Sequence, residues 1–467
     1  MSIITKTSSY IFLTTFVFFL ALWYLNPSNY IVAASFFVLI FIYDYKIRDI
    51  RLSLLLALLA STIVLTGKSY PIQLIPKGVL PLEIYPFGYF ARFTITSTQM
   101  LSAIAVLVII RDFANGKIKN FKLKSYELIL VFYFLWTVIS DYIGSGVPSF
   151  SLLFSLAGLT TLIMYFYIRL YVVRKKEFIK IFIYLLSALL MFESFISFQQ
   201  FFAKSPIGKV LESQQGIEYF GRTVDEILFT FRPSGTFGHA NALGIWLSSY
   251  LVILTVFFLI RPNYLFTTTI LAGTAAIILT LSRSSWIGLF IGVVTVLFVL
   301  EKIRKRRVSE KINRYLPWFI FLAIPLFIFI ILPRVEKSAF TFSQGGGYFR
   351  EVQTKKALEL IYKNPVFGVG SERSVPEGLK LVSPKDPNFS ILADVHNWFL
   401  RLIVEHGIPA LLLFLTLIYL YFKNLLTKTK FSLEGLGLAA GILATLTAGL
   451  FQPYINFQLI ILALAFL

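Results

Sequence analysis

The feature that most constrains this chain is a series of apolar runs that recurs along almost its whole length. The runs are bounded by charged residues, proline or glycine, and they cover residues 10–25, 30–44, 50–66, 94–110, 126–143, 150–173, 178–203, 240–260, 264–281, 284–300, 315–333, 398–422, 434–451 and 457–467. A perpendicular membrane helix needs about 20 apolar residues. Because several runs are shorter than this, the sequence predicts about 12–14 transmembrane helices.

Composition excludes a water-soluble fold. The chain is 57% hydrophobic and only 14% charged, whereas about a quarter of the residues of a soluble domain are charged. Within lipid the backbone must pair its own polar groups, which helices do. We therefore expect an all-α polytopic integral membrane protein. The first run follows Lys6 without a clear cleavage site, which predicts a retained first span. The last run is short, and we expect an incomplete final span.

The chain has no cysteine and only three histidines. Disulfides, thiolate catalysis and cysteine-ligated metals are excluded, and a histidine-rich metal site is disfavoured. We accordingly expect neither a metal nor a cofactor. The formal net charge of +20 is interpreted as basic loops that orient the protein in a lipid bilayer, and no nucleic-acid partner is expected.

Basic residues are concentrated in alternate loops, which predicts a cytoplasmic N-terminus. The basic loops contain Lys46, Arg48 and Arg51; Arg111, Lys117, Lys119, Lys122 and Lys124; Arg174, Lys175, Lys176 and Lys180; Arg261; Lys302, Arg304, Lys305, Arg306, Arg307, Lys311 and Arg314; and Lys423, Lys428 and Lys430. The intervening short loops 26–29 and 144–149 have no lysine or arginine. The pattern indicates a multi-pass membrane protein whose N-terminus lies on the cytoplasmic side.

This orientation places three longer connections and one tight turn on the outer face: 67–93, 204–239, 334–397 and 282–284. The chain then divides into N-terminal spans (1–203), central spans with an outer glycine-rich loop and a Ser-Arg-Ser turn (204–333), a long outer loop (334–397) and C-terminal spans (398–467). Within the long loop, Ala357, Leu358 and Ile361 recur at helical spacing. They predict an amphipathic helix from Arg350 to about Lys363, lying on the bundle or on the membrane surface and ended by Pro365.

Two arginines on the predicted outer face are candidate anion ligands. Arg283 stands between Ser282 and Ser284, whose hydroxyls offer further donors, and Arg350 follows three glycines. Arginine binds phosphate with a fork of donors and keeps its charge. The alternative for Arg283 is a side chain that extends to lipid headgroups, and for the helix that contains Arg350 it is a solvated lid.

The histidines and glycines supply the remaining candidates. Asp394 is a plausible helix cap, which would put His396 in the first helical turn with Gly407 on the same face, where a small residue admits a second helix. Histidine suits proton transfer, although a lone histidine is more often structural. The outer loop before residue 240 is expected to turn tightly at Gly235 and Gly238. Around this turn lie the polar side chains of Arg232, His239 and Asn241. Inside the preceding span, Glu193, Gln199 and Gln200 either line a wet crevice, or the carboxyl of Glu193 bonds a neighbouring helix.

At these positions the chain resembles the O-antigen ligase and O-antigen polymerase superfamily of bacterial membrane glycosyltransferases. The likeness covers about residues 230–420 and rests on four stretches: Gly235-Thr236-Phe237-Gly238-His239-Ala240-Asn241; Ser282-Arg283-Ser284; Arg350 through Asn364-Pro365-Val366-Phe367-Gly368-Val369-Gly370; and His396-Asn397 with Gly407. The last fits a His-Asn, nine residues, Gly, two residues, Gly pattern, except that Ala410 replaces the final glycine.

The resemblance implies an inverting, metal-independent transfer of a glycan from a polyprenyl diphosphate carrier, such as undecaprenyl diphosphate, to an acceptor hydroxyl outside the cytoplasmic membrane. Arg283 and Arg350 would hold the diphosphate and His396 would assist the acceptor, with Asn397, Ser282, Ser284, Arg232, His239 and Asn241 binding substrate. The acceptor is a lipid, as in lipopolysaccharide ligation, a glycan, as in a polysaccharide polymerase, or a protein. The His-Asn pattern favours a ligase. A transporter or flippase of lipid-linked glycans and a non-catalytic scaffold remain as alternatives from other classes.

Overall fold

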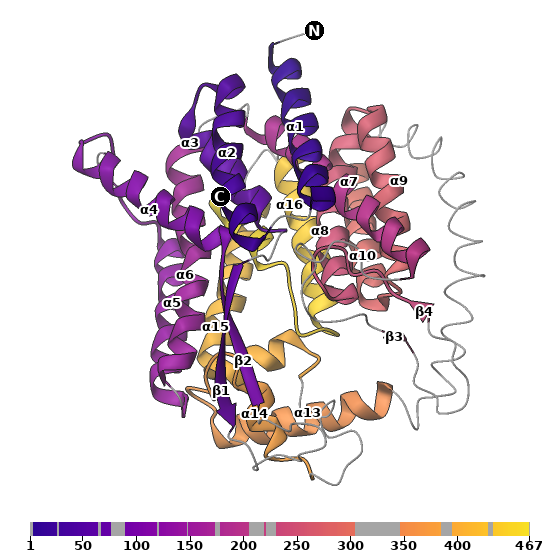
Figure 1. The fold of residues 1–467 in the computed structure, drawn as a ribbon. Helices are drawn as coiled ribbons and strands as arrows, with labels where there is room; N and C mark the ends of the chain where they lie inside the picture. The colour runs from indigo at the N-terminus through magenta and orange to yellow at the C-terminus, as the bar shows by residue number, and fades with distance from the viewer. Residues whose placement is uncertain are drawn as a thin grey trace.

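In the computed structural model of this chain, the described residues are 3–25, 28–63, 67–75, 89–118, 121–146, 148–172, 178–204, 219–220, 230–303, 346–383, 395–427 and 433–466. They form a bundle of long helices (Figure 1). The helices that follow the apolar runs are α1 (Ile3–Leu25), α2 (Asn29–Ile47), α3 (Ile50–Ser61), α4 (Ser97–Ala114), α5 (Ser125–Gly144), α6 (Pro148–Tyr171), α7 (Phe178–Ala203), α8 (Ala240–Ile260), α9 (Tyr264–Leu279), α10 (Arg283–Ile303), α15 (Trp398–Thr427), α16 (Leu433–Gly449) and α17 (Phe457–Ala465).

The expected fold class, an all-α polytopic membrane protein, is confirmed. Among the described residues, nine helices are long and apolar enough to cross a membrane, and three further apolar helices are shorter. The predicted run 315–333 lies outside the described residues. Every other predicted run coincides with a helix.

One outer connection differs from the expected loop. Strands β1 (Gly67–Ile75) and β2 (Tyr89–Thr96) form an antiparallel hairpin in which Pro71 pairs with Arg92, and the end of β2 occupies residues 94–96, which were predicted to begin a membrane span. A two-stranded sheet leaves one edge of each strand open, so a proline that lacks an N–H is tolerated. A second, minimal pair joins β3 (Tyr219–Phe220) to β4 (Thr230–Phe231).

Two helices of the predicted outer loop lie across one end of the bundle, α13 (Gly346–Lys363) and α14 (Ser374–Leu379) (Figure 1). The amphipathic helix therefore ends where it was predicted to end. Its buried face is different, because Ala357 and Leu360 pack against Val369, Val395 and Val404, while Leu358 is 53% exposed. We call this end of the molecule the α13 end.

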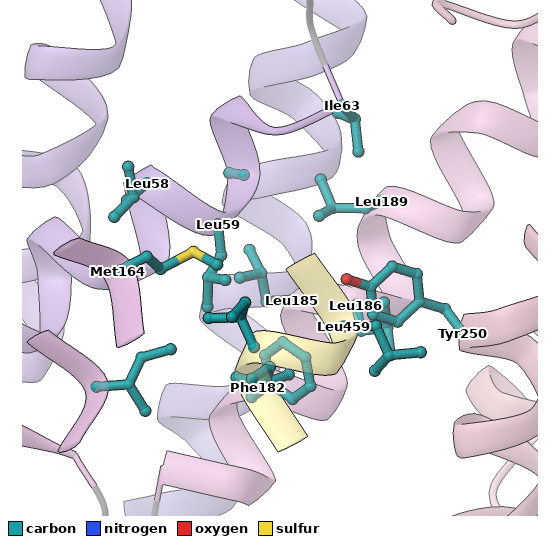
Figure 2. Packing of buried hydrophobic residues seen from close by; sticks show 14 of the residues in the cluster. Leu58, Leu59, Ile63, Met164, Phe182, Leu185, Leu186, Leu189, Tyr250 and Leu459 are labelled. Carbon is teal, nitrogen blue, oxygen red and sulfur yellow. The ribbon is translucent and has the colours of Figure 1, made fainter. Parts of the chain in front are cut away.

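The core is built where helices distant in sequence meet. Leu58 of α3, Met164 of α6, Leu186 of α7 and Leu459 of α17 belong to one buried apolar cluster (Figure 2). Helix α17 is buried throughout from Leu459 to Ala465. Such close packing holds the ends of the long helices in a fixed relation, which positions the side chains at the α13 end.

Buried carboxylates tie the N-terminal helices together. Asp112 of α4 pairs with Arg51 of α3 at 2.8 Å and accepts a hydrogen bond from Tyr171 of α6 at 2.8 Å. Glu127 of α5 pairs with Arg169 of α6 at 2.5 Å. A buried carboxylate is tolerated when it is paired and hydrogen-bonded. Some of the basic residues that were expected only to orient the protein thus also join helices.

Candidate active site

The glycine-rich turn before α8 is held by side chains of α7. Glu193 accepts hydrogen bonds from the backbone N–H of Thr236 at 3.1 Å and from its hydroxyl at 2.5 Å. Gln200 accepts from the N–H groups of Ser234 and Gly235 and donates to the carbonyl of Gly235. Gly235 has φ 58°, and a Cβ there would lie 2.2 Å from Glu193 Oε2. The carboxyl of Glu193 was expected either to line a wet crevice or to bond a neighbouring helix. It instead accepts hydrogen bonds from the turn at Thr236.

Arg232, His239 and Asn241 come together beside this turn. Arg232 donates to the carbonyl of Thr280 at 2.8 Å and to the side-chain oxygen of Asn241 at 2.6 Å. His239 caps α8, since its Nδ1 accepts from the N–H of Asn241 at 3.1 Å. Because Thr280 ends α9 just before the Ser-Arg-Ser turn, Arg232 joins two of the stretches predicted to contribute to the site.

Ser282 and Ser284 are buried and their hydroxyls contact each other at 3.2 Å. Ser282 also contacts the hydroxyl of Ser285 at 2.9 Å. Arg283 is the first residue of α10 and is exposed. The serines therefore shape the turn that presents Arg283. Their predicted contact with substrate stays a prediction.

Arg350 lies near the start of α13 and is exposed. Partial burial and the guanidinium of Arg283 both lower the pKa of Arg350. Arginine nevertheless stays charged in proteins. Among the described residues no carboxylate forms a salt bridge with Arg350. The guanidinium of Arg283 thus acts on that of Arg350 although the two belong to different helices, and neighbouring cations favour an anion.

His396 and Arg350 line the same open pocket of about 90 Å³. The other lining residues are Gln353, Thr354, Val395, Asn397, Leu400, Leu450 and Phe451. His396 precedes α15 instead of lying in its first turn. Asn397 takes the capping role expected of Asp394: its side-chain oxygen accepts from the N–H of Leu400 at 3.1 Å. Asp394 lies outside the described residues.

Gly407 corrects the expected helix packing. It has φ 77° and interrupts α15, so the straight-helix argument that put it on the face of His396 does not hold. The close neighbour is the segment after α13, since a Cβ on Gly407 would lie 1.8 Å from the carbonyl oxygen of Val366. Backbone bonds cross this contact: Ile408 donates to Pro365, and Val369 donates to Val404. Ala410, which replaces the last glycine of the pattern, is fully buried.

Sequence reasoning missed a buried polar cluster around His406. His406 Nδ1 lies 3.2 Å from the hydroxyl of Ser140 and 3.6 Å from Asp141 Oδ1. Asp141 accepts from both the N–H and the hydroxyl of Ser371, at 2.6 and 2.9 Å. This cluster joins α5, α15 and the segment after α13. No spacing in the sequence connects residues so far apart.

A second omission is the connection between α16 and α17. The carbonyl of Leu450 accepts from Asn397 at 3.0 Å, Gln452 accepts from Asn241 at 3.0 Å, and the ring of Tyr454 packs against that of His239. The available sequence signal was Gln452-Pro453, a polar and helix-breaking pair between two apolar runs.

Residues 267–415 match the family model described as O-antigen ligase. The matched region contains Arg283, Arg350 and His396, and it excludes Arg232 and the connection after α16. No curated protein matches the chain. Within the part of the chain that the structure describes, no three histidine or acidic side chains are grouped to hold a metal ion.

Proposed function

We propose, from the match of residues 267–415 to the O-antigen ligase family, that this protein transfers a glycan from a polyprenyl diphosphate carrier to an acceptor hydroxyl on the outer face of the cytoplasmic membrane. The observation that supports this most is the shared pocket of Arg350 and His396, with the charge of Arg283 acting on Arg350. In this proposal the pocket supplies an anion site and a proton acceptor side by side.

The reaction needs these two functions and little else. The acceptor oxygen attacks the anomeric carbon as the bond from that carbon to the diphosphate oxygen breaks. The bonding electron pair leaves with the diphosphate, whose charge the two arginines stabilise. Neutral His396 takes the proton of the acceptor hydroxyl and later releases it to water, a contribution of typically ~10²–10⁴-fold. Attack opposite the leaving group inverts the anomeric centre.

Within the superfamily, His396-Asn397, nine residues and Gly407 favour a ligase over a polymerase. The branch that glycosylates protein hydroxyls is the third alternative. A flippase for the same carrier-linked glycans would move the substrate across the bilayer without making a glycosidic bond. These alternatives differ in their products, so one reconstitution separates them.

The experiment supplies purified protein in lipid vesicles with a carrier-linked glycan and three acceptors: a lipid-linked core oligosaccharide, a second carrier-linked repeat and a serine-containing peptide. We expect the lipid-linked core to gain the mass of the glycan, in excess chelator as well as without it. A gain on the second repeat would identify a polymerase, and a gain on the peptide the protein-glycosylating branch. Translocation of the donor without any new product would contradict the proposal.

Matched variants connect this activity to the site. Arg350→Ala should abolish most transfer, and Arg350→Lys should restore only part of it, because lysine offers a point charge in place of a fork. Lys355→Ala, one turn along α13, removes a side chain that is paired with Glu351 at 2.7 Å and should leave transfer unchanged. If Arg350→Ala and Lys355→Ala lost transfer equally, the effect would reflect a general folding role of α13 and not a specific role of Arg350.

A further inference from the structure

The connection between α16 and α17 is fastened to several of the stretches that form the site. Leu450 is bound by Asn397, which adjoins His396, and Gln452 is bound by Asn241, which Arg232 also contacts. At its far end, Asn456 caps α17 by accepting from the N–H of Leu459. The connection is therefore fixed at several points, although it lies outside the matched region 267–415.

Leu450 and Phe451 of this connection line the pocket that holds Arg350 and His396. Their backbone continues α16 as a tight turn, with the N–H of Phe451 donating to the carbonyl of Ala448 at 3.0 Å. The side chain of Phe451 is 38% exposed, so part of its ring is available to a ligand. A large apolar side chain beside a charged group in a pocket is typical of a surface that receives the apolar part of a substrate.

We propose that Phe451 is a specificity-determining residue of the acceptor subsite, on which a sugar ring of the acceptor packs while its hydroxyl faces His396. This inference rests on the proposed function. The arginines take the charged donor, and the pocket wall made by Leu450 and Phe451 carries no charge. A pyranose has one face of C–H groups and a rim of hydroxyls. The C–H face suits the negative face of an aromatic ring, and the exposed hydroxyl of Thr354, which donates to the carbonyl of Arg350, can accept a hydrogen bond from the rim.

Asn397 acquires a defined part in this arrangement. Its amide oxygen caps α15 and its amide nitrogen holds the carbonyl of Leu450 at 3.0 Å. It therefore links the residue next to His396 with the residue next to Phe451. Asn397 is a positioning residue, whereas Phe451 contacts the acceptor.

The test measures transfer from the carrier-linked glycan to a core oligosaccharide over a range of acceptor concentrations. Phe451→Ala should raise the acceptor KM roughly three- to tenfold, the loss expected for one aromatic contact. The donor KM and the kcat at saturating acceptor should stay near their normal values. Phe451→Tyr should keep the low acceptor KM. Phe451→Leu, which keeps an apolar side chain but removes the ring, should resemble the alanine variant and guards against a simple folding defect.

Phe113→Ala is the matched control, because this side chain is 65% exposed on α4 and does not line the pocket. It should leave both KM values unchanged. An unchanged acceptor KM in Phe451→Ala would overturn this inference, and so would a donor KM raised as much as the acceptor KM. In either case, transfer by the wild type would still support the proposed function. An effect confined to a serine-containing peptide acceptor would overturn the sugar ring as the occupant. Absence of transfer by the wild type would overturn both proposals.

Discussion

Neighbouring guanidinium groups repel each other. Arg283 begins α10 and Arg350 lies in α13, and the charge of Arg283 lowers the pKa of Arg350. A ligand with two phosphate groups removes this repulsion. The residues thus predict a stabilising effect of diphosphate that is independent of any glycan.

Inorganic pyrophosphate should therefore raise the melting temperature of the detergent-solubilised protein. A ligand at 100 times its Kd stabilises by about 2.7 kcal/mol, which corresponds to a rise of several degrees. The rise should be lost in Arg350→Ala and kept in Lys355→Ala. Potassium chloride at matched ionic strength serves as the control for general salt effects. The same rise in the Arg350 variant would show that pyrophosphate binds elsewhere.

His396→Ala should reduce transfer by about 10²–10⁴-fold with no loss of protein from the membrane. The side chain lies before the first residue of α15 and lines the pocket, so its removal leaves the helix cap at Asn397 intact. Transfer rates and membrane abundance would be measured together. Near-normal turnover in this variant would require the proton to leave by another route.

The other two histidines serve as comparisons with different expected defects. His406 is buried in the cluster with Ser140, Asp141 and Ser371. His406→Ala should mainly lower stability, since leaving buried polar groups without partners costs about 1–3 kcal/mol. His239→Ala removes the cap of α8 and should have an intermediate effect on transfer, through the position of Asn241 and Arg232.

At the scale of elements, the break in α15 decides how α13 is attached. The kink at Gly407 leaves the carbonyl groups of Val404 and Glu405 without helical partners, and the N–H groups of Val369 and Gly370 bind them at 2.8 and 2.9 Å. The segment after α13 thereby completes the hydrogen bonding of α15. Arg350 lies on α13 and His396 immediately precedes α15. These backbone bonds therefore link the two helices that position the pair.

Gly407→Ala should accordingly be among the most harmful single substitutions. The new Cβ would meet the carbonyl oxygen of Val366 at 1.8 Å, and φ 77° is unfavourable for any side chain. We expect a loss of about 2–5 kcal/mol from the combined backbone strain and overpacking. Gly116→Ala is an informative control, because φ is 67° and no atom lies within 4 Å of the added Cβ. Melting temperatures of the two variants would separate the clash from the strain, and equal shifts would contradict the role assigned to the contact.

The sequence predicted some elements of the site well and others poorly, for physical reasons. The extent of α13 followed from Pro365 and the helical spacing before it. Its buried face did not, because Leu358 and Leu360 are equally apolar and only the position of Val404 decides between them. The cluster around His406 depends on contacts between residues more than 200 positions apart, which no local pattern encodes.

For the whole molecule, the apolar runs sufficed to predict the helices because lipid allows few other structures. The hairpin of β1 and β2 lay mostly outside that argument, since residues 67–75 and 89–93 belong to a predicted connection and only residues 94–96 fall in a predicted apolar run. The basic loops predicted which residues lie at the same end of the bundle. The contacts agree with that grouping, because α13, the start of α15 and the end of α16 meet at one pocket.

Sidedness itself is open to a direct test, for which the absence of cysteine gives a clean background. Tyr362 on α13 and Tyr264 at the start of α9 are 87% and 92% exposed, so cysteine should be tolerated at either position. Positive-inside counting puts Tyr362 outside and Tyr264, three residues after Arg261, inside. In intact cells an impermeant thiol reagent should label Tyr362→Cys and spare Tyr264→Cys, and both should react once the membrane is permeabilised. The reverse pattern would place Arg350 and His396 on the cytoplasmic face, where the proposed donor and acceptor would have to be sought instead.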